Sequence, residues 1–169
     1  MDTRHADSEA IVADQEYDSA ASDSAVAPNS DTFADVLHIE FTYDDPERVE
    51  AIMPILPQFH QPFGYVHGGV TLALLETVAS RGAHMHCDMS KERPFGVEID
   101  VRHRKSAQSG HIRGVAELDH EEPSKVSGMK QYWNVRAYDD AGDVMSEGIF
   151  VTKVVSLEHL ATRKQNRAQ

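Results

Sequence analysis

The stretch VTLALLETVAS, residues 70–80, limits the possible folds more than any other part of the chain. Drawn as a helix, it is apolar on every side and carries a single acid. Its apolar positions up to residue 79 are Val70, Leu72, Ala73, Leu74, Leu75, Val78 and Ala79. A helix of this composition is expected inside the fold, with the remaining chain wrapped around it. We predict that it runs from about residue 69 to residue 86.

Segments with period-two alternation lie on both sides of this helix and predict strands. The predicted strands are residues 36–43, 49–54, 95–103, 111–119, 129–138 and 143–155. The order ββαββββ has no βαβ alternation, so it predicts an α+β fold with an antiparallel sheet and one long helix. Because one helix cannot cover both faces of a six-stranded sheet, we expect oligomers that pair sheet edges or faces.

Charge is distributed unevenly along the 169 residues, whose net charge is −12. Residues 1–35 hold nine acids and one base, and they show little apolar periodicity. We therefore expect residues 1–33 to form an acidic, disordered tail. The folded domain is predicted at 34–156, followed by a polar C-terminal tail at 157–169.

Composition also excludes several classes of protein. An acidic surface argues against a nucleic-acid partner, and no apolar run approaches the ~18 residues that span a membrane. The one cysteine, Cys87, rules out an intrachain disulfide framework. No GxSxG, HExxH, CxxC or Walker pattern is present, so we expect no metal and no nucleotide chemistry. A cytoplasmic location is the default expectation.

Glu76 is the single acid of the apolar helix, and its neighbours offer no cation. The residues three and four positions away are Leu72, Ala73, Ala79 and Ser80. A buried, unpaired carboxylate has a raised pKa, which suits a base or a nucleophile that works near neutral pH. The alternative is a glutamate on a solvated stripe with Thr77 and Ser80, and spacing alone favours neither interpretation.

Gly68 and Gly69 precede the helix and give it an unobstructed N-terminus. Free backbone N–H groups at such an end favour anions, including the oxyanion that forms when a carbonyl is attacked. Alternatively, the glycines serve only a sharp turn. Glu76 lies about two turns further on, at ~10–12 Å. If both groups act on one carbonyl, a second copy of the helix must supply Glu76, so this geometry predicts a dimer.

The segment HQPFGYVHGGVTLALLETVAS, residues 60–80, closely resembles the signature of hotdog-fold acyl-CoA thioesterases. The resemblance is to the branch with the 4-hydroxybenzoyl-CoA, 1,4-dihydroxy-2-naphthoyl-CoA and enterobactin-proofreading thioesterases. VEIDVRH and SGHIRGVAEL resemble the next strands of that family, and the likeness extends over roughly residues 36–155. It implies the hotdog fold, in which a curled antiparallel sheet wraps a central helix.

The resemblance also implies roles for individual residues. Glu76 matches the catalytic carboxylate, which is either the nucleophile or the base for water, and Gly68 matches the N–H that polarises the thioester carbonyl. Gln61 and His67 match side chains about the thioester, and Ser80 matches the residue that positions water or the carboxylate. In the family, the glutamate comes from the opposite subunit. Taken alone, Gln61 is an ordinary loop residue and His67 a hydrogen bonder at the helix start.

Coenzyme A carries phosphates, so cations are expected near the site. The resemblance indicates His103 and Lys105, in the RHRK segment at 102–105, as phosphate contacts. The alternative is a solvated turn. Where the family has a short glycine-containing turn, this chain has the longer and more acidic DHEEPSKVSGMK, residues 119–130. The groups available there are Lys125, Ser127, Gly128 and Lys130.

Together these features predict an acyl-CoA thioesterase that releases CoA from an aromatic acyl group, such as 1,4-dihydroxy-2-naphthoyl or hydroxybenzoyl. No cofactor is expected, because CoA is part of the substrate, and the expected assembly is a homodimer or a homotetramer. A hydratase or dehydratase on the same fold is one alternative. A non-catalytic acyl-CoA-binding protein is another.

Overall fold

The computed structural model describes residues 32–167, and it contains the predicted ββαββββ order. The elements are α2 (Phe33–Val36), β1 (Glu40–Asp45), β2 (Arg48–Pro54), η1 (Pro57–Phe59), α3 (Gly68–Met85), β3 (Glu92–His103), β4 (His111–Pro123), β5 (Met129–Tyr138), β6 (Val144–Ser156) and α4 (Leu157–Arg167). The helix predicted from residue 69 to 86 is α3, and all six predicted strands are present. Period-two and helical patterning therefore located these elements to within a few residues.

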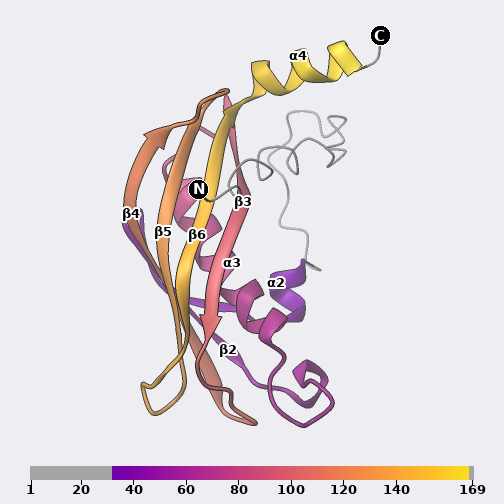
Figure 1. The fold of residues 1–169 in the computed structure, drawn as a ribbon, viewed down its shortest axis with the longest axis vertical. Helices are drawn as coiled ribbons and strands as arrows, with labels where there is room; N and C mark the ends of the chain where they lie inside the picture. Colours follow the sequence, from indigo (N-terminus) through magenta and orange to yellow (C-terminus); the bar gives the residue numbers. More distant parts are fainter. Residues whose placement is uncertain (1–31, 168–169) are drawn as a thin grey trace, which may run out of the picture.

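All six strands form one antiparallel sheet in the order β1-β2-β4-β5-β6-β3. Figure 1 shows this sheet curving around α3, which lies against its concave side. This is the predicted hotdog arrangement. The sheet ends at β1 on one side and at β3 on the other, and β3 pairs only with β6 among the described residues.

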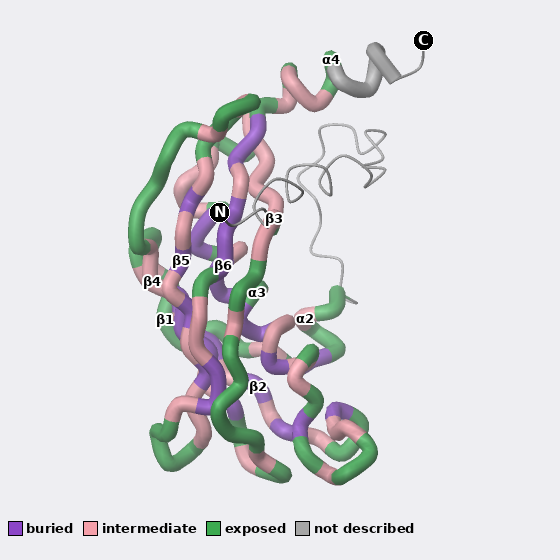
Figure 2. The backbone as a smooth tube through the Cα atoms, viewed as in Figure 1, coloured by how far each residue is buried: buried purple, intermediate pink, exposed green. Residues whose placement is uncertain are grey.

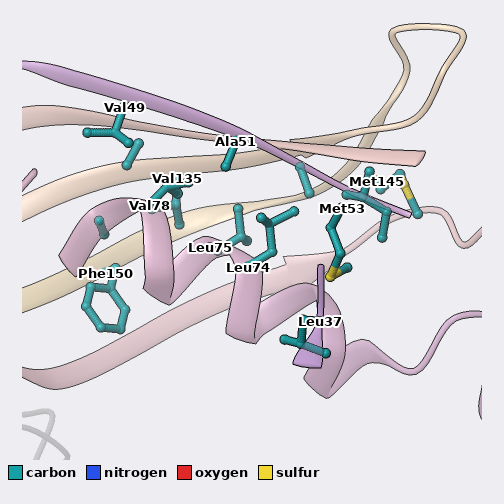
Figure 3. Close-up of a cluster of buried hydrophobic side chains, with 14 of the residues drawn as sticks. Leu37, Val49, Ala51, Met53, Leu74, Leu75, Val78, Val135, Met145 and Phe150 are labelled. Atoms are coloured by element: carbon teal, nitrogen blue, oxygen red, sulfur yellow. The ribbon is translucent and has the colours of Figure 1, made fainter. Parts of the chain in front are cut away.

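The core lies between α3 and the concave face of the sheet. Leu74, Leu75 and Val78 of α3 have no exposed surface, and Figure 3 shows them close to the strands that cover the helix. In β2, every second side chain is buried, as period-two alternation requires when one face meets the core. Val49, Ala51 and Met53 are those inward side chains.

The opposite side of α3 is open, although the sequence predicted burial all round. Glu76, Arg81 and His84 are exposed, and Leu72 and Ala73 are only partly buried. The cause is architectural, because the sheet covers one face of the helix and nothing else in residues 32–167 covers the other. Figure 2 shows the same contrast as buried and exposed segments along the α3 tube.

The chain before β1 differs from the prediction of a strand from residue 36. Thr32 and Asp35 form a capping box, in which Thr32 N–H donates to the Asp35 carboxylate at 2.9 Å. This box starts the short helix α2, so the strand begins later, at Glu40. Leu37, just after α2, is 2% exposed and joins the core. The acidic tail predicted for residues 1–33 lies, up to residue 31, outside the described residues.

At the other end of the chain, α4 occupies most of the predicted polar tail. Figure 1 shows α4 leaving the end of β6 and running away from the sheet. No helix within residues 32–167 is long and apolar enough to cross a membrane.

Trp133 of β5 fixes the position of the C-terminal half of α3. Its side chain is fully buried, and its Nε1–H donates to Thr152 Oγ1 at 3.1 Å. Thr152 in turn donates to Gln131 Oε1 at 2.9 Å, so the indole is held by a buried polar chain. Gly82 faces this indole, because a Cβ built there would lie 2.4 Å from the Trp133 ring. The absence of a side chain at residue 82 therefore allows the close approach of helix and sheet.

We predict that Gly82→Ala destabilises the protein. Alanine gains ~1 kcal/mol in helix propensity, but overpacking a rigid core costs ~1–3 kcal/mol, and the indole cannot move aside. Urea unfolding should therefore show a lower free energy of unfolding. In a Trp133→Leu background the clash is relieved, and Gly82→Ala should become neutral or stabilising. A stabilising effect in the wild-type background would contradict this account of the contact.

Candidate active site

The segment between η1 and α3 holds Gln61 in a closed turn. Gln61 N–H donates to Tyr65 O at 2.8 Å, and Gly64 N–H donates to Gln61 O at 3.0 Å. Gly64 has φ +82°, a backbone conformation that favours glycine. Val66 N–H donates to Ala107 O at 2.9 Å, so the loop between β3 and β4 supports this turn.

The side chain of Gln61 is also oriented from within the turn. Its Oε1 accepts a hydrogen bond from Phe63 N–H at 3.0 Å. The amide Nε2 has no partner in the described part of the chain, so it is available to donate to a ligand. Gln61 is thus a donor oriented by the turn that precedes α3.

His67 caps the N-terminus of α3. Its Nδ1 accepts from Gly69 N–H at 2.9 Å, and its carbonyl accepts from Val70 N–H at 3.0 Å and Thr71 N–H at 3.4 Å. An Nδ1 that accepts a hydrogen bond carries no proton, so this contact leaves Nε2 as the ring nitrogen that can donate. Of these first amides, only Gly68 N–H has no partner within residues 32–167. The helix start therefore presents one free backbone donor, at the glycine that the sequence analysis selected.

Glu76 has neither a hydrogen bond nor an ion pair among the described residues. Its side chain is exposed in the single chain, which corrects the prediction that it is buried. Partial burial nevertheless raises the pKa of its carboxyl group, in the predicted direction. On its inner side the carboxylate lies against β3, where a Cβ built at Gly96 would be 3.2 Å from Glu76 Oε1 and 2.6 Å from Phe150.

The strand beside Glu76 is irregular. The register of β3 against β6 shifts between Gly96 and Glu98, as at a β-bulge, and such bulges are common beside active sites. Ser80 lies one helical turn after Glu76 on the same open side of α3 and is partly buried. Gly68 lies eight residues before Glu76, about 12 Å along the helix axis. The free N–H and the carboxylate of one chain therefore do not meet.

The side chain of His103 lies between Ser146 and Gly68, at the start of α3. Its Nδ1 is 2.8 Å from Ser146 Oγ, and a Cβ built at Gly68 would be 2.9 Å from its Nε2. Lys105 is exposed and forms ion pairs with Asp139 at 2.5 Å and Asp143 at 2.6 Å. Hydrogen bonds to these carboxylates raise the pKa of the Lys105 ammonium.

The other predicted CoA contacts lie elsewhere. Lys125, Ser127 and Gly128 are in the β4–β5 loop, whereas Lys105 pairs with the β5–β6 turn. The ten residues of β5 separate these two ends, a span of about 33 Å at strand rise. One chain therefore does not bring the two predicted groups of CoA contacts together. Among the described residues, no three His, Cys, Asp or Glu side chains are grouped so as to hold a metal ion.

Sequence reasoning missed Gly96, Phe150 and Ser146 as parts of this site. Period-two patterns locate strands but not their register, and it is the register that places His103 opposite Ser146. The available signal was Gly96 itself, because it lies inside the predicted strand 95–103 and a glycine in a strand often marks a bulge or a close approach.

Comparisons with known proteins agree with this fold. Residues 63–146 match the thioesterase superfamily. The chain is 29% identical over 119 residues to the 1,4-dihydroxy-2-naphthoyl-CoA hydrolase of Escherichia coli K12, covering 70% of this chain and 83% of that protein. It is 32% identical over 111 residues to the proofreading thioesterase EntH of Cronobacter turicensis, covering 66% of this chain and 77% of that protein.

Solved structures give the same result. The crystal structure of a mutant of thioesterase PA1618 from Pseudomonas aeruginosa matches with a TM-score of 0.69 and 28% identity, over 76% of this chain and 88% of that one. The chain therefore belongs to the thioesterase superfamily, as the signature at residues 60–80 predicted. This membership makes it an enzyme of the thioester hydrolase class.

We predict that His67→Ala lowers the free energy of unfolding by about 1 kcal/mol, the usual cost of losing a helix N-cap. His67→Asn should recover most of this loss, because asparagine is a good N-cap residue. Urea unfolding of the two variants measures the difference. Equal stability of His67→Ala and wild type would show that the Gly69 contact does not stabilise α3.

Proposed function

We propose that the protein hydrolyses an aromatic acyl-CoA thioester to the free acid and CoA. One observation carries the proposal: within residues 32–167, α3 bears a free Gly68 N–H at its start and, eight residues later, a Glu76 carboxylate without a partner, whose pKa is raised by burial. A donor for an oxyanion and a carboxylate poised as base or nucleophile are the two groups that thioester hydrolysis requires.

Each active site takes Gly68 from one copy of the chain and Glu76 from a second. The ~12 Å between them on one helix prevents both from acting on the same carbonyl. Two features of the single chain suit such a dimer. The open side of α3 carries small side chains, including Ala73 and Ser80, and the outer edge of the twelve-residue strand β3 is unpaired among the described residues.

In this site the thioester oxygen accepts a hydrogen bond from Gly68 N–H, and Gln61 Nε2–H orients the thioester. Glu76 of the other copy either attacks the carbonyl carbon or takes a proton from an attacking water, and Ser80 positions the water or the carboxylate. The tetrahedral intermediate collapses with cleavage of the C–S bond, and CoA leaves as its thiolate. If Glu76 is the nucleophile, this step leaves an acyl–Glu76 anhydride, which water then hydrolyses to the free acid and the regenerated carboxylate. A raised Glu76 pKa makes the carboxylate a stronger base than an ordinary surface glutamate.

The acyl group is aromatic in this proposal. Phe63 and Tyr65, on either side of the turn after Gln61, are 82% and 42% exposed. Exposed aromatic side chains beside the thioester donors offer stacking partners for an aryl ring. The similarity to a 1,4-dihydroxy-2-naphthoyl-CoA hydrolase supports the same class. The CoA phosphates are bound by Lys105 of one copy and by Lys125, Ser127 and Gly128 of the other.

The first prediction for this function concerns Glu76→Gln, which keeps the shape of the side chain but removes its charge and basicity. We expect kcat to fall by at least ~10²-fold, the scale on which positioned proton-transfer groups act. In the wild type, kcat/KM should decline on acidification at a higher pH than an ordinary glutamate would give, because the Glu76 pKa is raised. Thiol release from a panel of aryl-CoA and alkyl-CoA esters measures both effects.

Outcomes of this panel separate the alternatives. Hydrolysis of alkyl esters in preference to aryl esters would correct the acyl group alone. Tight binding of acyl-CoA without release of CoA from any ester would favour the non-catalytic binding protein. Hydration of a 2-enoyl-CoA without thiol release would favour the hydratase. Near-normal turnover by Glu76→Gln would end the mechanism.

The second prediction uses mixed dimers of Glu76→Gln and Gln61→Ala. If the two residues meet across the interface, a mixed dimer has one intact site and one doubly damaged site. Random exchange at equal amounts should then restore about a quarter of wild-type activity, as expected for a twofold-symmetric dimer. If both residues act within one chain, every site is damaged and mixing restores nothing. Thiol release after subunit exchange decides between these results.

A further inference from the structure

We propose that the His103 imidazole is a second hydrogen-bond donor to the thioester oxygen, beside Gly68 N–H of the same chain. The inference rests on the proposed thioesterase function, and it gives His103 a role at the reacting atoms in place of a contact with the CoA phosphates. Three observations carry it: where Nε2 points, what holds the ring, and how few backbone donors at the helix start are free among the described residues.

The tip of the imidazole points at Gly68. A Cβ built at this glycine would lie 2.9 Å from His103 Nε2, whereas the flanking ring carbons Cε1 and Cδ2 would be 3.3 and 3.4 Å away. Any side chain at residue 68 would occupy the space at which Nε2 is aimed. Gly68 therefore contributes its N–H and also leaves room for a second donor immediately beside that N–H.

The orientation of the ring is set from behind by Ser146. His103 and Ser146 are paired across β3 and β6, and Nδ1 lies 2.8 Å from Oγ. Ser146 is 1% exposed, so no solvent competes for this contact. When the hydroxyl donates to Nδ1, the neutral imidazole carries its proton on Nε2, facing the helix start. The proposal takes the buried serine as the donor in this contact, which leaves His103 Nε2–H to donate toward Gly68.

Among the described residues, the backbone of the helix start leaves one donor free, Gly68 N–H, and in the proposed site Gln61 Nε2–H orients the thioester. Oxyanion sites commonly use more than one preorganised donor, but Gly69 N–H is occupied by His67 Nδ1. Two neighbouring cations of the same segment, Arg104 and Lys105, are paired with carboxylates. Arg104 Nε donates to Glu147 Oε1 at 2.6 Å, and Lys105 pairs with the β5–β6 turn. His103 is the member of this segment that the structure places against Gly68.

The chemistry conserves atoms and charge. As water or Glu76 attacks, the carbonyl oxygen becomes an oxyanion that accepts from Gly68 N–H and from His103 Nε2–H. The proton stays on His103, the carbonyl re-forms, and the C–S bond breaks to release the thiolate. When water attacks, its proton passes to Glu76; when Glu76 attacks, water then hydrolyses the acyl–Glu76 anhydride to the free acid. The histidine is therefore a hydrogen-bond donor, and it transfers no proton.

A comparison of two substrates tests the inference. One is the preferred CoA ester, and the other is the N-acetylcysteamine thioester of the same acid, which lacks the nucleotide and all phosphates. We expect His103→Ala to lower kcat by about 10²-fold on both substrates, the scale of losing one oxyanion donor. His103→Gln, which can still donate, should retain more activity than His103→Ala. A contact with phosphate would instead raise KM on the CoA ester and leave the truncated ester unaffected.

Two further variants complete the experiment. Arg104→Ala is the matched control, because its side chain pairs with Glu147 and should leave kcat unchanged on both substrates. Ser146→Ala should lower kcat on both substrates by less than His103→Ala, since it releases the ring without removing the donor. Ser146→Ala also tests the inference without any substitution at His103 itself. Tm values establish that each variant is folded.

The possible results separate this inference from the function on which it rests. Full activity of His103→Ala on the truncated ester, with an active wild type, would overturn the inference and leave the thioesterase intact. A change in KM on the CoA ester alone would do the same. Failure of the wild type to release thiol from any thioester would instead overturn the proposed function.

Discussion

The packing of α3 against the concave side of a single antiparallel sheet is the contact on which the rest of this structure depends. Leu74, Leu75 and Val78 are removed from solvent by the sheet, and Gly82 allows Trp133 to approach the helix closely. Because the sheet covers only one face, the opposite side of α3 stays accessible along its whole length. Glu76 and Ser80, two of the proposed site residues, lie on that accessible side of a helix that is held in place by the core.

Glycines at both ends of the site serve close approach. Gly68 leaves space for the tip of His103, and Gly96 leaves space beside the Glu76 carboxylate and Phe150. In each case a side chain would be displaced by even one added methyl group. The site is therefore shaped as much by missing Cβ atoms as by the polar groups, and substitutions at either glycine would move a functional side chain.

The electrostatics of Glu76 link the site to stability. Its pKa is raised in the folded chain, mainly by desolvation, so folding favours the protonated form. Stability from this group is present below the unfolded pKa and is lost as pH rises through the folded pKa. At neutral pH the ionised carboxylate is therefore a cost to the fold. A partnerless acid kept at such a cost is expected where function requires it.

The sequence was sufficient for the topology and for the start of α3 to within one residue, whereas the choice of Gly68 and Glu76 as site residues stays a prediction. These predictions depended on local patterns: apolar periodicity, paired glycines and the missing cation around Glu76. It was insufficient for contacts set by strand register, such as His103 with Ser146, because alternation does not reveal which residues face each other. It also missed α2, where the capping box of Thr32 and Asp35 overrides the alternation that begins at residue 36.

The prediction that α3 is buried all round was wrong for the single chain, and its failure is informative. Leu72 and Ala73 lie on the open side and are only partly buried, although apolar side chains there have no reason to face water. In the proposed dimer a second copy covers this side, and the all-round apolar pattern is then satisfied. The same cover would further desolvate Glu76 and bring it to the Gly68 of the other copy. Burial of the helix, basicity of the carboxylate and completion of the site would thus all arise from one association.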